Sequence, residues 1–297
     1  MRSHRVIYAA LIGNLLVAVT KTVAAAITGS SAMLSEAVHS AVDTSNELLL
    51  LYGISRSRRP PHPDHPLGHG RELYFWSFIV ALLIFALGAG ISMYEGIIHI
   101  RHPEPITHPL VNYVVLAFAS LFEGWTWLIA LRQFRAAQGS RRFWEAFKRS
   151  KDPPSFMILF EDSAALIGIL IAAAGTFAAT RLGFPVADGI ASILIGLVLA
   201  GISVLLARES KSLLIGERAN PELTEGILRI ARQASGVAEV SVAMTVQLAP
   251  DQIVVALSFR FPDDWRASEV VERVRKIEHA VQTAFPEVVD LFIKPRA

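Results

Sequence analysis

The chain of 297 residues contains no cysteine and few charged side chains. The lack of cysteine excludes disulfide scaffolds, CxxC redox centres, thiolate zinc sites and cysteine nucleophiles. Any metal site must therefore use imidazole, carboxylate, carbonyl or water ligands. Charged residues make up 18% of the sequence, against about 25% in soluble domains. This shortfall argues against a cytosolic enzyme or a disordered chain, and a net charge of +2 does not favour nucleic acid as a partner.

Long apolar runs, by contrast, are abundant. A run of about 20 apolar residues can cross the hydrocarbon core of a bilayer as a helix. Six such runs predict an integral membrane α-helical domain with six transmembrane helices; they are Val6–Ile27, Ala32–Ile54, Leu73–Ile98, Leu110–Leu131, Ser155–Thr180 and Val186–Ala207. Buried core helices of a soluble protein are the alternative, but six in so short a stretch make that reading improbable.

The placement of Lys and Arg predicts the orientation in the membrane. The N-terminus and the second and fourth connections carry 13 of these cations, whereas the other connections carry only Arg101 and Arg181. Because cytoplasmic loops are enriched in Lys and Arg, we expect both termini in the cytoplasm. The sequence shows no transit peptide, so the simplest location is the inner (cytoplasmic) membrane of a bacterium.

The composition changes after Ala207, which predicts two domains, a transmembrane domain at 1–208 and a cytoplasmic domain at 209–297. Helical periods at Pro221–Ala234 and Arg266–Phe285 alternate with strand patterns at 239–247, Gln252–Phe261 and Val288–Ile293. This αββαβ order suits a small α+β domain of ferredoxin-like type. A domain of this size has a marginal core, which makes a homodimer plausible.

The second apolar run carries ionisable residues on one helical face. Glu36, His39, Asp43 and Glu47 are spaced by 3, 4 and 4 residues. Such residues within a membrane are costly and point to function. His39 and Asp43 can present an imidazole and a carboxylate to one divalent ion. A structural polar seam between helices is the alternative, and Glu36 and Glu47 could simply lie at the interfaces.

Other acidic residues interrupt the later runs. Glu161 and Asp162 lie in the fifth, where one or both should face the second, unless an acid pairs structurally with Lys21. Asp188 opens the last run and is interpreted as a helix cap. Glu123 in the fourth run is interpreted as structural.

These residues carry a resemblance to a known family. The run from Gly29 to Asp43 and the loop from His65 to Glu72 resemble signatures of the cation diffusion facilitator family. The stretch Leu159–Ala165 is similar to the branch that includes the mitochondrial zinc exporter of animals. The resemblance implies six spans, a cytoplasmic ferredoxin-like domain and a homodimer that exports divalent metal in exchange for protons by alternating access. The protein would then be no enzyme, and the metal, most simply Zn²⁺ but also Mn²⁺, Fe²⁺, Co²⁺ or Ni²⁺, would be its substrate.

The resemblance also implies a transport site. Two ligands match His39 and Asp43, and Asp162 matches the second position of the motif in the fifth span. The first position of that motif is Ile158, which cannot bind metal, so Glu161 is the candidate for the missing ligand. This departure favours the competing function, a non-transporting metal-binding membrane sensor or scaffold.

Two connections carry further chemistry. His62, His65 and His69 lie within eight positions of a proline-rich loop and match a second metal site of related transporters; a pH-sensitive loop that binds nothing is the alternative. The run from Arg141 to Arg149 interleaves cations and aromatics and predicts an interfacial helix on anionic membrane lipid. His99, His102 and His108 are interpreted as a solvated loop. The C-terminal region has the single histidine His279, so no histidine-rich regulatory metal site is expected there.

Overall fold

The computed structural model describes residues 4–138, 142–236 and 240–296. The chain divides into two compact units: residues up to Ser55 with Phe75–Ser210, and Arg56–Tyr74 with Lys211–Ala297. The boundary expected between 208 and 209 therefore falls inside a helix, two residues before the change of unit. The loop that carries the three histidines belongs to the second unit.

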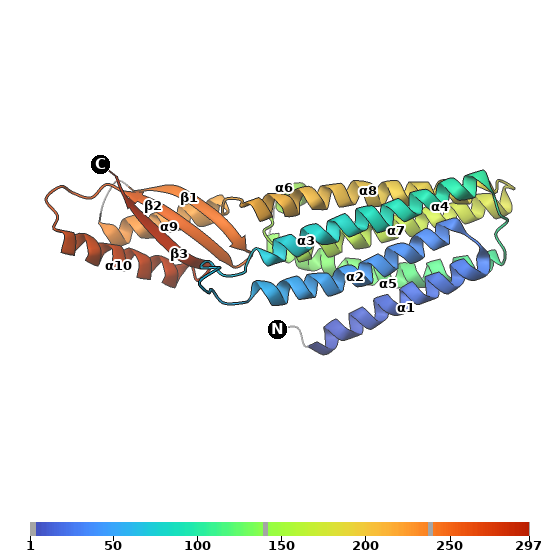
Figure 1. Ribbon diagram of the computed structural model, residues 1–297, viewed down its shortest axis with the longest axis horizontal. Coiled ribbons are helices and arrows are strands. Elements are labelled where there is room, and N and C mark those ends of the chain that lie inside the picture. Colours follow the sequence, from blue (N-terminus) through green and yellow to red (C-terminus); the bar gives the residue numbers. More distant parts are fainter. Residues whose placement is uncertain (1–3, 139–141, 237–239, 297) are drawn as a thin grey trace. The chain divides into compact units, whose positions relative to one another are not determined.

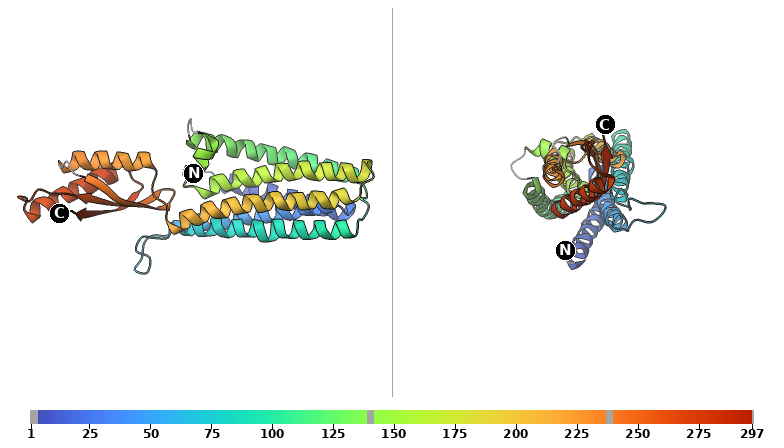
Figure 2. Two further views of the ribbon diagram at one scale, coloured as in Figure 1. Left: turned by 90° about the horizontal axis from the view of Figure 1, so that it is seen from above. Right: turned by 90° about the vertical axis from the view of Figure 1, so that its left-hand side faces the viewer.

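Long helices build the first unit, and they run alongside one another in a bundle (Figures 1 and 2). They are α1 (His4–Thr28), α2 (Ser31–Ser57), α3 (Glu72–Leu83), α4 (Gly90–Arg101), α5 (Pro109–Gln138), α7 (Pro153–Arg181) and α8 (Val186–Ile215). A π-helical segment, η1 (Ile84–Ala89), joins α3 to α4 without a break. α5 packs against both α7 and α1. Each predicted apolar run coincides with one of these helical stretches.

Four helices within the described residues are long and apolar enough to cross a membrane. They are Glu72–Arg101, Pro109–Ala136, Pro153–Arg181 and Val186–Ile215. Within α1, Gly13–Thr28 is a shorter apolar helical stretch, and α2, which carries the polar face, is not among the four. The protein is thus a multi-pass helical membrane protein.

Local sequence explains where α1 and α2 meet. α1 ends at Thr28 because Gly29 adopts a φ of 68°, which favours glycine, and its amide donates to the Ala25 carbonyl. Ser30 then caps α2, since its hydroxyl accepts a hydrogen bond from the Met33 amide at 3.1 Å. The two helices are therefore joined by a tight turn.

The short helix α6 (Phe143–Arg149) lies within the run that predicts an interfacial helix. Arg141 of that run is outside the described residues. Phe147 is buried and packs edge-on against Phe156 of α7, with ring centroids 5.1 Å apart. Trp144 is exposed. The helix therefore presents one face to α7 and leaves another uncovered.

The C-terminal unit contains two helices and one sheet in the order αββαβ, as expected from the sequence. Its elements are α9 (Pro221–Ser235), β1 (Val240–Ala249), β2 (Gln252–Phe259), α10 (Ala267–Ala284) and β3 (Val288–Pro295). The sheet order is β1-β2-β3, with β1 antiparallel and β3 parallel to β2. Glu239, expected to open the first strand, is outside the described residues.

An apolar core holds this unit together. Ile227 and Ala231 of α9 and Ile277 and Val281 of α10 are fully buried against Val255 of β2. These residues recur at helical and strand periods, which is why the sequence alone predicts the elements. Two polar side chains of this unit, Ser235 and Gln247, are buried as well.

Candidate metal site

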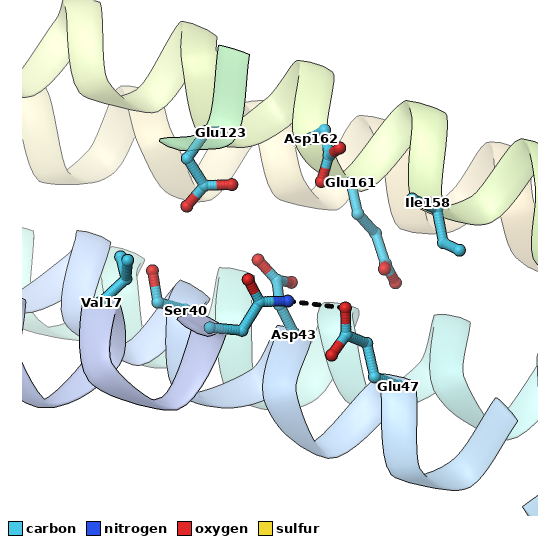
Figure 3. A pocket seen from close by; sticks show the side chains of 9 residues that line it. Val17, Ser40, Asp43, Glu47, Glu123, Ile158, Glu161 and Asp162 are labelled. Carbon is cyan, nitrogen blue, oxygen red and sulfur yellow. Dashed lines mark hydrogen bonds between the residues drawn. The ribbon is translucent and has the colours of Figure 1, made fainter. Parts of the chain in front are cut away.

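A pocket lies between α1, α2, α5 and α7 of the helical unit. Five carboxylate side chains line it, together with polar and apolar residues (Figure 3). The lining residues are Asn14, Val17, Ser40, Asp43, Glu47, Glu123, Ile158, Glu161 and Asp162. Three of the four predicted site residues, Asp43, Glu161 and Asp162, are thus brought to one cavity.

α2 supplies two of the acids because of its spacing. Asp43 and Glu47 are four residues apart, so they project from the same helical face. Glu47 is a residue for which the sequence leaves a simple interfacial position open. It lines the pocket and accepts a hydrogen bond from Asn14 of α1 at 2.6 Å.

His39 lies one turn before Asp43 and is 1% exposed. Its Nδ1 atom is 3.3 Å from Asp43 Oδ1, although His39 does not line the pocket itself. Neither imidazole nitrogen, nor Asp43 Oδ1, has a hydrogen-bond partner. Because buried polar atoms normally have a partner, this cluster is suited to an added proton or cation.

α7 supplies the adjacent acids Glu161 and Asp162. Neighbours on a helix point about 100° apart, but both line the pocket. The carboxylate of Glu161 accepts a hydrogen bond from the Asn46 amide of α2 at 3.1 Å. Asp162 Oδ2 has no partner. Ile158, one turn earlier, places a hydrocarbon side chain on the same wall.

Lys21 of α1 does not pair with Glu161 or Asp162, the pairing that the sequence leaves open. Its fully buried ammonium contacts Glu36 Oε2 at 3.0 Å, Ser40 Oγ at 2.8 Å and Glu123 Oε1 at 3.5 Å. Glu36, for which the sequence also allows a position at the membrane interface, is fully buried in this ion pair. The acids of α7 are therefore not neutralised by direct contact with Lys21.

The pocket thus concentrates negative charge in a largely apolar bundle. Five acids line it, whereas Lys21, the neighbouring cation, is already bonded to Glu36. Isolated buried carboxylates are costly unless a cation or a proton compensates them. Carboxylate oxygens together with an imidazole form a donor set that divalent transition metals accept. The residues present therefore fit a divalent cation.

The three loop histidines form a separate cluster in the second unit. Reciprocal backbone hydrogen bonds between His62 and His65, at 2.8 and 3.2 Å, close a tight turn. Ligand atoms of His62, His65 and His69 lie within 4.8 Å of one another, which is close enough to hold one metal ion. Burial, with neighbouring His65 and His62, lowers the pKa of His69, so that its neutral, metal-binding form is favoured.

Asp188 is a helix cap, as expected, but it caps α2 and not α8, the helix to which it belongs. Although it lies in the first turn of α8, its carboxylate accepts hydrogen bonds from Ser30 Oγ at 2.7 Å and from the amides of Ser31 and Ala32 at 2.5 and 3.3 Å. These amides belong to the start of α2. His99, expected in a solvated loop, is instead 8% exposed, and its Nε2 is 3.8 Å from Asp188.

Sequence reasoning missed two amides at the site. Asn14 and Asn46 hold Glu47 and Glu161 respectively. Asn46 lies three residues after Asp43, on the polar face of α2, and this spacing was the available signal. No pattern pointed to Asn14, because it is an isolated polar residue in an apolar run.

The fold and the pocket define the class: a multi-pass helical membrane protein with an acidic pocket inside its bundle. A model of the cation efflux transmembrane domain matches residues 7–215. The chain therefore belongs to the cation diffusion facilitator family, whose transporters are not enzymes.

Individual relatives agree with this assignment. The chain is 36% identical over 212 residues to the mitochondrial proton-coupled zinc antiporter SLC30A9 of Xenopus laevis, and 33% identical over 235 residues to metal tolerance protein C4 of Arabidopsis thaliana. It is 26% identical over 235 residues to the manganese efflux system protein MneP of Bacillus subtilis. These alignments cover 71%, 78% and 75% of this chain. They span 38%, 51% and 72% of the respective relatives, so the animal protein is much longer than the matched part.

Proposed function

We propose that the protein is a proton-coupled efflux transporter, an antiporter of divalent metal cations with zinc as the leading substrate. The observation that carries the proposal is the pocket in which Asp43, Glu161 and Asp162 meet beside the unpartnered imidazole of His39. These four residues are the proposed ligands. The names of the zinc antiporter and manganese efflux relatives support the substrate class.

Protons and metal compete for the same groups in this proposal. A bound cation compensates the buried carboxylates, and when it leaves, protons on the carboxylates or on His39 take over that role. Metal ligands must be deprotonated, so each metal bound displaces protons. Alternate exposure of the pocket to the two sides of the membrane then couples outward metal movement to inward proton movement.

The proposed organisation follows from the same argument. A transmembrane domain at 1–208 would span the membrane six times, and 209–297 would form a ferredoxin-like cytoplasmic domain that pairs in a homodimer. Both termini would face the cytoplasm from the inner membrane. The αββαβ order and the excess of cations in two connections support this organisation. His62, His65 and His69 would form an auxiliary site, and α6 would contact anionic lipid.

Flux measurements test the proposal. The purified chain is reconstituted into liposomes that contain a fluorescent zinc indicator, and zinc is added with and without a pH gradient. We expect zinc uptake to accelerate when the inside of the liposomes is more acidic than the outside, because protons then leave as zinc enters. Liposomes whose protein binds zinc but never moves it would favour the alternative, a metal-binding sensor or scaffold, which the hydrocarbon side chain of Ile158 on the pocket wall supports.

A reporter tests the orientation separately. A reporter that is active only in the cytoplasm should function when fused after Ala297. If a reporter that is active only outside the cytoplasm functions at this position instead, the assigned orientation and direction of transport are wrong.

A further inference from the structure

Lys21 and Glu123 form a contact that the proposed mechanism does not use. The Lys21 ammonium is fully buried in α1, and Glu36 and Ser40 already bond it at 3.0 and 2.8 Å. Glu123 of α5 is a second carboxylate, 3.5 Å from the same ammonium. One carboxylate is enough to neutralise one buried lysine. The presence of Glu123 is therefore not explained by the charge of Lys21.

Glu123 also belongs to the pocket. Its side chain, 10% exposed, lines the cavity from α5, whereas Asp43 and Asp162 line it from α2 and α7. In Figure 3 its carboxylate points away from α5 into the space between the helices. Glu123 thus has Lys21 beside it and the candidate metal ligands across the cavity.

The other walls leave room for an additional oxygen ligand. Ile158 offers no donor, and one oxygen of Glu161 is occupied by the Asn46 amide. Asp162 Oδ2, Asp43 Oδ1 and both nitrogens of the buried His39 have no partner. An ion held by these atoms would accept a further carboxylate, because divalent transition metals commonly bind four or more ligands.

We propose that Glu123 is a ligand of the transported cation, and that Lys21 and the cation compete for its carboxylate. The inference rests on the proposed function, since it adds a residue to that site. Lys21 tolerates the loss of Glu123 because its bond to Glu36 persists. Metal binding would then draw the Glu123 side chain of α5 away from Lys21 of α1 and into the pocket.

Metal titration of the purified full chain tests the proposal. Glu123→Gln keeps the shape of the side chain and removes its charge, so it should weaken Zn²⁺ binding at least about tenfold. It should also alter the visible absorption of bound Co²⁺, because the spectrum reports the ligands themselves. Glu95→Gln is the matched control: Glu95 lies in α4 and does not line the pocket, so both readouts should stay as in the wild type.

The competing cation supplies a second test that leaves Glu123 in place. The double variant Lys21→Met with Glu36→Gln removes both members of the ion pair, so that neither is left as an unpaired charge. It frees Glu123, so Zn²⁺ should bind several-fold more tightly. The same double change in the Glu123→Gln background should have no such effect, because the shared carboxylate is gone.

The outcomes separate this inference from the proposed function. If Asp43→Asn abolishes binding while Glu123→Gln retains wild-type affinity and Co²⁺ absorption, Glu123 is no ligand and the transport site stands. If the ion-pair variant binds no more tightly than the wild type, competition by Lys21 is refuted. If Asp43→Asn binds like the wild type, the proposed site itself is misplaced.

Discussion

The two units of the molecule bury different kinds of side chain. The C-terminal unit has a core of apolar residues such as Val255 and Ile277, beneath helices with charged outer faces. The helical unit buries apolar side chains too, but it also exposes Leu121 and Phe118, which are 72% and 70% accessible, and buries the ionic contact of Lys21 with Glu36. In water, burial follows hydrophobicity, whereas in a bilayer the apolar side chains face lipid and polar groups face one another.

This difference determines what a substitution should reveal in each unit. In the C-terminal unit, apolar residues carry stability. In the helical unit, buried ionisable residues are costly, so we expect those that line the pocket to carry function. The following predictions test that contrast, from the largest expected effect to the smallest.

Loss of a pocket acid should have the largest effect. Asp43→Ala and Asp162→Ala should each eliminate zinc flux in liposomes while the helical fold, followed by circular dichroism, survives. The reason is that each change removes from the cavity a carboxylate that we propose as a metal ligand. The same substitution at the exposed Asp251 of the C-terminal unit should leave flux unchanged. Wild-type flux from Asp43→Ala would remove the basis for the transport site.

The loop histidines should have an intermediate effect. Replacing His62, His65 and His69 together with Ala should lower the metal bound per protomer, since their ligand atoms gather within 4.8 Å. Flux should fall but persist, because the pocket acids are intact. Metal content measured by atomic emission decides the point. An unchanged metal-to-protein ratio would show that these histidines are a solvated loop.

Apolar truncation should separate the units by stability. Ile277→Ala removes a fully buried side chain from the C-terminal core and should cost about 2–5 kcal/mol in unfolding free energy. Leu121→Ala removes a side chain that is exposed on α5, and it should change stability far less. Thermal unfolding in detergent gives both values. Equal losses would mean that Leu121 is covered, for example by a second copy of the chain.

The smallest effect is expected at the cap of α2. Asp188→Ala removes the acceptor of the Ser31 and Ala32 amides and should cost about 2 kcal/mol, the upper end for a helix cap. Hydrogen exchange at these amides should accelerate more than exchange in the middle of α2. Uniform exchange throughout α2 would indicate that Asp188 acts on the whole bundle.

Much of the architecture follows from local sequence, because apolar length and periodicity are one-dimensional properties. The helical stretches and the αββαβ order were predicted in this way, with ends that differ by a few residues. α2 was predicted to carry a polar face, and the structure shows that Asp43 and Glu47 of this face line the pocket.

The remaining features depend on which helices become neighbours. The sequence contains several carboxylates that could pair with Lys21, and only the packing of the helices shows that its partners are Glu36 and Glu123. The sequence alone favours a structural role for Glu123, since a lone acid in an apolar helix does not indicate its partners. Likewise, the sequence predicts that Asp188 is a helix cap. It does not predict that the capped amide, that of Ser31, lies 157 residues earlier in the chain.

That last contact has a consequence for biogenesis. Ser31 and Asp188 are separated by 157 residues, so α2 is synthesised and inserted long before its charged acceptor exists. Until α8 follows, the amides of Ser31 and Ala32 lack the Asp188 carboxylate, whereas the Met33 amide already has the Ser30 hydroxyl. The N-terminal turn of α2 is therefore completed only when the last long helix of the bundle docks. A chain interrupted before α8 would leave that turn without its charged cap.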